Sequence, residues 1–183
     1  TEVLAGLQIA FLAFYAPLRQ YGGVLRQFLK DDKGFVAIII FTGCESNAVS
    51  ACRCALKIRE NFLANDMTSS VGIASGKVFF GPVGDYRRCE MAWIGDSVNL
   101  SARLMSKSNE VEGAKPIFCD KTTAENAGGE IYFELHGMVK LKGKGLTPIH
   151  TLISLKHKGS VLNSQLSSIA KLSSPSQVFD NLA

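Results

Sequence analysis

Residues 71–105 read VGIASGKVFFGPVGDYRRCEMAWIGDSVNLSARLM, and this stretch decides the fold. Apolar residues punctuated by glycine predict a strand within residues 69–76, followed by a hairpin over residues 77–95. The Gly-Asp-Ser turn at residues 95–97 then predicts the start of a helix over residues 97–107. A strand, a hairpin and a helix therefore follow one another with short connections.

The predicted helix carries an asparagine and an arginine four residues apart. Asp96 or Ser97 would cap its first turn, because either side chain can accept a hydrogen bond from an unpaired backbone N–H. Asn99 and Arg103 then share one face, since four residues make little more than one turn. An amide beside a guanidinium suits an oxygen-rich anion, and the alternative is a solvated helix face.

The residues before this stretch predict a helix, a hairpin and a second helix. A helix over residues 2–20 ends at a glycine pair, Gly22 and Gly23. Two strands, residues 24–29 and 35–41, flank an Asp/Gly turn, and a helix follows over residues 46–64. The second strand, FVAIIIF, is apolar on both faces and is therefore expected in the middle of a sheet.

The residues after this stretch predict mostly strands. They are residues 115–120, 132–136, 138–143 and 148–155, with a helix at residues 121–127. The order of elements predicts an α+β fold of the ferredoxin-like kind, a mixed sheet with helices packed on one face. An opening strand before the first helix is absent from this pattern. We expect one domain over residues 1–158 and a serine-rich linker or tail over residues 159–183.

Composition narrows the function classes. The 183 residues are 46% hydrophobic, which is enough for a core. The net charge of +4 is compatible with a phosphate-bearing ligand but is far too small to indicate a nucleic acid, and we expect no nucleic-acid partner. The odd cysteine count without a CxxC pair argues against zinc and a disulfide framework, and favours a reducing, cytoplasmic setting. The three histidines are too scattered to predict a metal site. These residues are Cys44, Cys52, Cys54, Cys89, Cys119, His136, His150 and His157.

Residues 3–18 are nearly all apolar but do not predict a membrane span. The stretch has 16 residues, contains Gln8 and Pro17, and lacks the basic flank of a signal peptide. We expect a buried or partner-facing helix, with a truncated membrane helix as the alternative.

Two motifs give the sequence a family resemblance. Residues 71–105 resemble the core signature of class III nucleotide cyclases, in which a GI-x-x-G strand, a G-x-x-G hairpin and G-D-x-V-N-x-x-x-R-L follow in order. Residues 139–152, VKLKGKGLTPIHTL, resemble the closing Lys-Gly-Lys-Gly strand pair of that family. The resemblance covers residues 5–155 and is nearest to the second catalytic half of a bicarbonate-responsive soluble adenylyl cyclase.

The resemblance implies an enzyme that works as a pair of domains. In such cyclases two homologous domains clasp head to tail around ATP, and one of them supplies two aspartates that bind Mg²⁺ or Mn²⁺. The other supplies an asparagine that orients the ribose, matched here by Asn99, and an arginine that meets phosphate charge, matched by Arg103. Lys144 resembles the residue that holds the terminal phosphates. The products would be cyclic AMP and pyrophosphate.

The resemblance also implies that this chain supplies no metal ligand. The family's first metal aspartate lies on the strand before the first helix, and this sequence starts after that point. Its second lies in a Gly-Asp-Gly-Phe hairpin, where DKGF here places Lys33, and an ammonium cannot bind Mg²⁺. Asp31 and Asp32 are expected to serve the turn. The metal ligands would come from a complementary cyclase domain.

The positions that read the base depart from the family pattern. Where the second-half type carries a lysine and a polar residue, this sequence has Gln27, flanked by Arg26, and Ala92, followed by Trp93. Gln27 can hydrogen-bond a base edge and Trp93 can pack on one, but Ala92 offers no polar group.

Three hypotheses about function therefore remain open. The first is a second-half adenylyl cyclase domain that is active only when paired. The second is a degenerate cyclase-like module that dimerises, or binds a nucleotide or small anion, without turnover. The third is a scaffolding α+β domain unrelated to nucleotides, which requires both motifs to occur by chance.

Overall fold

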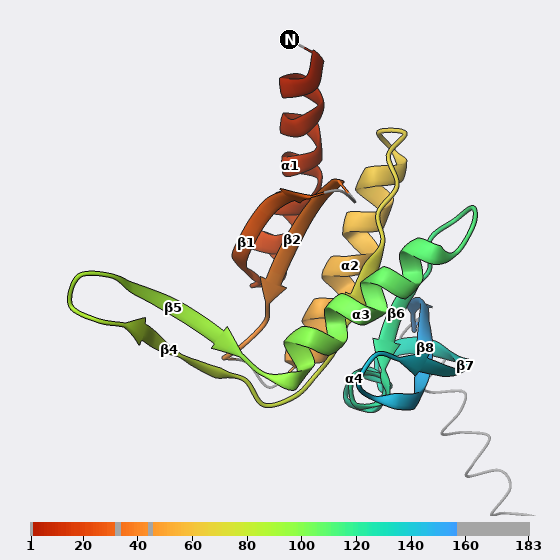
Figure 1. Ribbon diagram of the computed structural model, residues 1–183. Helices are drawn as coiled ribbons and strands as arrows, with labels where there is room; N and C mark the ends of the chain where they lie inside the picture. The colour runs from red at the N-terminus through yellow and green to blue at the C-terminus, as the bar shows by residue number, and fades with distance from the viewer. Residues whose placement is uncertain (1, 32–33, 44–45, 157–183) are drawn as a thin grey trace, which may run out of the picture.

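The largest sheet of the structure is mixed and has four strands, and it is called the central sheet below. The computed structural model describes residues 2–31, 34–43 and 46–156 (Figure 1). Its helices are α1 (Glu2–Gln20), α2 (Asn47–Leu63), α3 (Asp96–Glu110) and α4 (Lys121–Ala127). Its strands are β1 (Val24–Asp31), β2 (Gly34–Ile40), β3 (Val71–Ile73), β4 (Phe79–Gly84), β5 (Cys89–Ile94), β6 (Ile117–Asp120), β7 (Ile131–Leu141) and β8 (Gly145–Leu155).

The strand order in the central sheet is β3-β6-β8-β7. β3 and β6 are parallel, and the other two pairs are antiparallel, so the predicted α+β fold with a mixed sheet is confirmed. The predicted strands at residues 132–136 and 138–143 form one strand, β7, with an irregularity between Leu135 and Gly137.

Helices cover both faces of this sheet. Ile117 and Cys119 of β6 pack in a cluster with α2, whereas Phe118 between them packs with Leu100 and Leu104 of α3. Successive strand residues point to opposite faces, so α2 and α3 lie on opposite sides of β6. The expectation that the helices share one face is wrong in this respect. All four residues of β6 are buried because both its faces are covered.

The contact between β3 and α3 is closest at Gly72. A Cβ atom at this position would lie 2.2 Å from the carbonyl oxygen of Ser101 and 2.4 Å from the backbone nitrogen of Met105. Only glycine leaves room for the helix backbone at this distance. This contact fixes how far α3 lies from the sheet.

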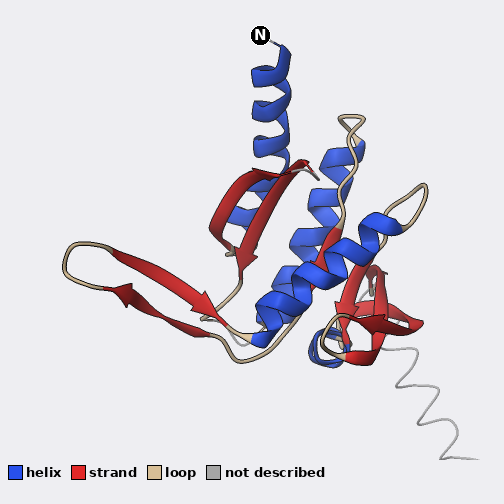
Figure 2. Cartoon of the chain, viewed as in Figure 1, coloured by secondary structure: helices blue, strands red, loops and turns tan. Residues whose placement is uncertain are grey.

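The hairpin β1–β2 stands apart from the central sheet, as Figure 2 shows in red. Among the described strands β2 pairs with β1 alone, so the prediction that FVAIIIF lies in the middle of a sheet is wrong. Its apolar side chains are instead partly buried, because Ala37 and Ile39 pack with Phe14 of α1 and Cys54 of α2.

α1 carries apolar side chains both where it packs on the rest of the structure and where it is exposed. Phe14 and Leu18 are buried, whereas Leu4, Ile9 and Leu12 are exposed. The helix ends as predicted at the glycine pair, where the N–H of Gly23 donates to the carbonyl of Leu18. No helix in the described residues is both long and apolar enough to span a bilayer.

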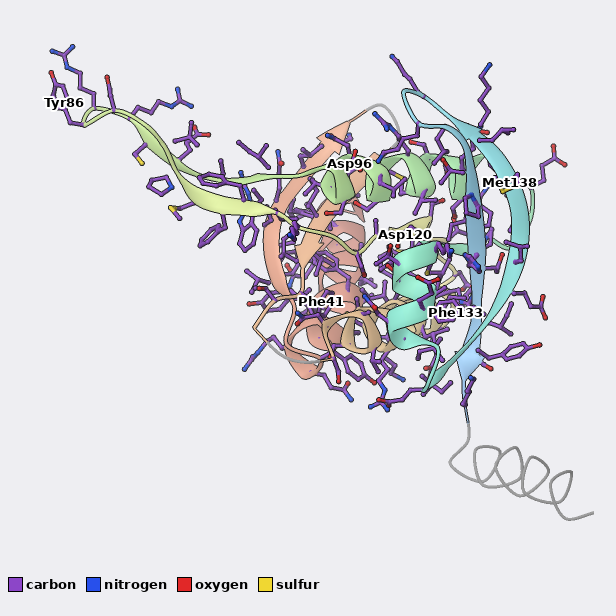
Figure 3. The ribbon with its side chains drawn as sticks, turned by 90° about the horizontal axis from the view of Figure 1, so that it is seen from below. Phe41, Tyr86, Asp96, Asp120, Phe133 and Met138 are labelled. Carbon is purple, nitrogen blue, oxygen red and sulfur yellow. The ribbon has the colours of Figure 1, made fainter. Side chains whose placement is uncertain are left out.

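The hairpin β4–β5 forms an arm that projects from the body (Figure 1). Tyr86 lies at its tip, 89% exposed and far from the rest of the chain (Figure 3). The tip is closed by Asp85, whose carboxylate accepts hydrogen bonds from the backbone N–H groups of Arg87 and Arg88 at 2.8 and 3.0 Å. The hydrogen bond from Arg88, and to a lesser extent the one from Arg87, hold the pKa of the Asp85 carboxyl below its usual value.

Some of the predicted features fall outside the described residues. These are the serine-rich segment over residues 159–183, together with Asp32, Lys33, Cys44 and His157. The described cysteines, Cys52, Cys54, Cys89 and Cys119, are free. Burial raises the pKa of the Cys54 thiol to about 12.

The packing at Gly72 predicts a large effect from adding one methyl group. Gly72→Ala should lower the free energy of unfolding by about 2–3 kcal/mol, because the atoms it meets belong to the α3 backbone and cannot rotate away. Urea denaturation followed by circular dichroism measures the change.

Gly129→Ala provides the matched control for this prediction. A Cβ at Gly129 meets nothing within 4 Å, so this variant should unfold as the unchanged chain does, within about 0.5 kcal/mol. Equal stability of the two variants would mean that the close contact of β3 with α3 is absent.

Candidate functional site

α3 has a buried side and an open side. Leu100 and Leu104 are buried against the sheet, whereas Asn99 is exposed and Arg103 is half-buried on the other side. The residue that precedes the helix is Gly95, and no side chain caps it, so the prediction that Asp96 or Ser97 serves as N-cap is wrong.

Asn99 and Arg103 line one cavity, as their spacing predicted. It lies between α3 and the end of β7 and has a volume of about 550 Å³. We call this cavity the basic trough. Its lining consists of Asn99, Ala102, Arg103, Ser106, Lys107, Glu110, Lys140, Leu141 and Lys142.

The turn between β7 and β8 closes one end of the site. It is the Lys-Gly-Lys-Gly motif, in which Gly143 and Gly145 have φ values of 71° and 69°, a left-handed conformation that favours glycine. The N–H of Lys144 donates to the carbonyl of Leu141 at 3.0 Å. A Cβ at Gly143 would lie 3.6 Å from a guanidinium nitrogen of Arg103, so the turn lies directly beside that side chain.

Lys144 lies beside the basic trough rather than inside it. Its ammonium forms an ion pair with the carboxylate of Asp96, the first residue of α3. Figure 3 shows Asp96 where that helix begins. Asp96 is three residues before Asn99, so the pair sits about one helical turn from the Asn99 end of the trough. The structure therefore brings Asn99, Arg103 and Lys144 together along the first half of α3.

Positive charge dominates the lining of the basic trough. Four cations face one carboxylate, Glu110, whose oxygen lies 2.7 Å from the ammonium of Lys107. Sequence reasoning missed Lys107, Lys140 and Lys142. The signal for two of them was present in the alternation of residues 140–144, KLKGK, because residues two apart point the same way along a strand.

The structure separates the three candidate base-binding residues. Ala92 pairs with Gly81, and Trp93 pairs with Phe80, so their side chains point to opposite faces of the arm. The Trp93 ring stacks on Phe80 with the ring centroids 4.0 Å apart. Ala92 lines a second cavity of about 570 Å³.

Arg26, rather than Gln27, shares this second cavity with Ala92. Arg26 lies at an irregularity in the pairing of β1 with β2, which lets two successive residues of β1 face a single step of the partner strand. Gln27 is exposed on β1 and does not line the cavity.

The described residues do not fit a metal ion. They contain no group of three or more His, Cys, Asp or Glu side chains arranged to bind one. The carboxylates nearest the site, Asp96 and Glu110, are each held by a lysine ammonium, whereas Mg²⁺ takes free carboxylate oxygens.

Curated relatives of this sequence are adenylate cyclases. The chain is 30% identical over 138 residues to human adenylate cyclase type 10, covering 72% of this chain and 8% of that protein. It is 28% identical over 146 residues to the terminal-differentiation specific adenylate cyclase of Dictyostelium discoideum, covering 73% of this chain and 7% of that protein. The chain thus spans less than a tenth of these two relatives. No protein-family model matches the sequence.

Solved structures with this fold are nucleotide cyclases. The guanylate cyclase domain of RhGC from Catenaria anguillulae, in complex with GTP, matches with a TM-score of 0.70 and 21% identity, covering 84% of this chain and 85% of that one. The adenylyl cyclase CyaB from P. aeruginosa matches with a TM-score of 0.68 and 23% identity, covering 86% and 85%. The sequence relatives and the solved structures that share this fold are class III adenylyl and guanylyl cyclases, which confirms the resemblance predicted from the sequence.

Proposed function

We propose that this chain is the second-half catalytic domain of an adenylyl cyclase, which converts ATP to cyclic AMP and pyrophosphate when joined to a complementary domain. The observation that carries the proposal is the meeting of Asn99 and Arg103 in a cavity with a basic wall. A triphosphate is the kind of anion that such a wall attracts.

The proposed chemistry needs positioning and charge stabilisation more than reactive groups. The ribose 3′-oxygen forms a bond to the α-phosphorus, the bond from that phosphorus to the bridging oxygen breaks, and pyrophosphate leaves with the electron pair. The hydroxyl proton passes to solvent. Asn99 holds the ribose by its amide, and Arg103 meets the charge that develops on the phosphate oxygens.

Lys144 is assigned to the terminal phosphates. Its ammonium is neutralised by Asp96, a carboxylate that is well exposed. A triphosphate carries more negative charge than one carboxylate, so Lys144 can exchange Asp96 for a phosphate oxygen by rotating its side chain. The ion pair keeps the lysine at the mouth of the site until then.

The partner domain is proposed to supply the metal-binding aspartates and to contact the arm. Both faces of the arm are apolar: Phe79, Val83 and Ile94 lie on one face, and Phe80, Met91 and Trp93 lie on the other. Exposed apolar surface on both faces of a two-stranded hairpin favours a protein contact. Mg²⁺ or Mn²⁺ would then be held across the interface and not by the described residues.

ATP is the proposed substrate because the curated relatives are adenylate cyclases, although one solved neighbour binds GTP. The base would lie near the second cavity, which Arg26 and Ala92 both line and to which Gln27 is close in sequence. A cytoplasmic location stays a prediction from the cysteine pattern.

A degenerate binding module is the second candidate. It is favoured by Ala92, which offers no polar group to a base. Such a module would bind nucleotide or a small anion through the same basic trough without turning it over.

Removal of one guanidinium separates the two candidates. When this chain is mixed with the metal-competent half from the same parent protein, ATP and Mg²⁺ or Mn²⁺, cyclic AMP should form. Arg103→Ala should lower that rate by roughly 10²- to 10³-fold, because one preorganised charge contact in the transition state is lost. Cyclic AMP is measured by chromatography, and assembly of the pair by size exclusion.

Arg53→Ala serves as the matched control. Arg53 lies on α2 and pairs with Glu130 at 2.5 Å, on the other side of the sheet from α3, so the rate should stay within about twofold. Turnover that survives Arg103→Ala would refute the catalytic role, and no turnover by an assembled pair would favour the binding module.

The arm gives a second prediction. Met91→Asp places a charge among the exposed apolar residues of the arm, so it should weaken association with the partner half by roughly tenfold or more while leaving the thermal midpoint unchanged. Analytical ultracentrifugation measures the association.

The control for the arm is Leu135→Asp, which makes the same kind of change at an exposed apolar residue of β7. If both variants associate as the unchanged chain does, the arm is not part of the interface.

A further inference from the structure

One side of α1 is packed on the structure and the other is open. On the packed side, Phe14 lies in a cluster with Cys54 and Ile58 of α2. The side-chain amide of Asn61 on α2 also donates a hydrogen bond to the carbonyl of Ala13 at 3.0 Å. The open side is called the outer stripe, and its residues recur at helical spacing and are all exposed. They are Leu4, Ala5, Gln8, Ile9, Leu12, Tyr15, Ala16 and Arg19.

The outer stripe is apolar where the open side of a helix is ordinarily polar. Leu4, Ile9 and Leu12 are 65%, 45% and 55% exposed, and Gln8 and Arg19 are the polar residues of the stripe. The first turns of α1 also project beyond the other elements (Figure 1). A helix with apolar residues on both sides has a second surface to cover, so the outer stripe is expected to contact another molecule.

The outer stripe matches itself when its direction is reversed. Ala5, Ile9, Leu12 and Ala16 follow one another at intervals of four, three and four residues, so the order small, large, large, small is the same in both directions. Two antiparallel copies, related by an axis between residues 10 and 11, would place Ala5 opposite Ala16 and Ile9 opposite Leu12. A two-fold interface needs this kind of self-complementary surface.

The charges of α1 follow the same symmetry. The helix has two charged residues, Glu2 at its start and Arg19 in its last turn. In an antiparallel pair each end lies beside the oppositely charged end of the second copy, whereas a parallel pair brings like charges together. The dipoles of two antiparallel helices also oppose one another. Both effects favour the antiparallel arrangement.

A lipid surface suits the outer stripe less well. A helix that lies in a membrane interface carries several lysines and arginines on its polar face, where they meet anionic lipids. α1 has Arg19 as its one basic residue, and the face opposite the outer stripe is packed on α2. The charge pattern therefore favours a second protein surface of the same kind.

We propose that the outer stripe is a dimer interface, at which it packs antiparallel on the outer stripe of a second copy of this chain. The interface is separate from the basic trough, because α1 packs on α2, and α2 and α3 lie on opposite faces of β6. The dimer therefore leaves Asn99 and Arg103 open. Two of the proposed cyclase pairs would be joined through α1 into a larger assembly.

The size of the interface sets its strength. α1 has 19 residues, which is about 28 Å of helix at the usual rise per residue. A contact made by one helix from each copy is smaller than the roughly 1,600 Å² of a standard protein interface. The dimer is therefore expected to dissociate in roughly the micromolar range, where concentration decides how much of it forms.

The test is sedimentation velocity of the full 183-residue chain over a range of concentrations. From about 1 to 100 µM the sedimentation coefficient should rise from that of a monomer to that of a dimer. The double variant Ile9→Gln with Leu12→Gln should raise the dissociation constant roughly tenfold or more, because each substitution occurs twice in the dimer. Its thermal midpoint by circular dichroism should stay unchanged, since both side chains are exposed.

A matched double variant controls for the loss of exposed apolar surface. Leu135→Gln with Leu155→Gln changes two side chains of the central sheet that are 65% and 45% exposed, close to the values for Leu12 and Ile9. The dissociation constant of this variant should stay within about twofold of that of the unchanged chain.

Cross-linking tests the direction of the two helices. Ala5→Cys and Ala16→Cys are placed on separate chains, both with Cys89→Ser, because Cys89 is the exposed cysteine among those described. Oxidised together, the two chains should form a disulfide-linked dimer. Each alone should stay at the level of the chain with Cys89→Ser only, because each introduced cysteine lies about 16 Å along the helix from its own counterpart, too far for a disulfide.

Three results would overturn the inference. They are sedimentation as a monomer up to about 100 µM, equal weakening of the dimer in both double variants, and cross-linking of each cysteine variant with itself. None of these measurements depends on turnover, so the inference and the proposed cyclase function fail separately. A dimer that requires Ile9 and Leu12 supports the inference even if the reconstituted pair makes no cyclic AMP.

Discussion

The close contact of α3 with β3 at Gly72 is the constraint on which the site depends. Because the helix backbone touches the strand backbone there, Leu100 and Leu104 enter the core and the opposite side of α3 is left open. β8 pairs with β6, which packs on the same helix, and β7 pairs with β8, so the glycine-rich turn between β7 and β8 lies beside Arg103. A single close approach thus sets the distance between the helix and the turn that together form the basic trough.

Sequence reasoning succeeds where the cause is local. The shared face of Asn99 and Arg103 follows from helical geometry, and the end of α1 follows from the glycine pair after it. The motif order was also sufficient to predict the family. It did not predict that Lys144 pairs with Asp96, because that contact joins two residues 48 apart whose meeting depends on the whole sheet.

Sequence reasoning fails where the environment of a residue depends on which elements pack together. The apolar pattern of β2 reports that its side chains avoid water, but it cannot tell whether a strand or a helix covers them. For the same reason, the sequence of β6 alone does not show that both its faces are buried. That depends on α2 and α3, which pack on opposite faces of the strand. Lys140 and Lys142 were passed over because charged residues near a turn are usually solvated, and only the proximity of α3 makes them part of a cavity.

The arm has a consequence for how two such domains associate. Among the described strands β4 and β5 pair only with each other, and a two-stranded hairpin has little stability of its own in water. In the proposed pair of domains, part of the contact energy gained by docking the arm is therefore used to order it, which lowers the affinity below that expected from the buried area. A pair of domains joined in this way separates readily, so its activity can follow small changes in association while every residue of the active site stays the same.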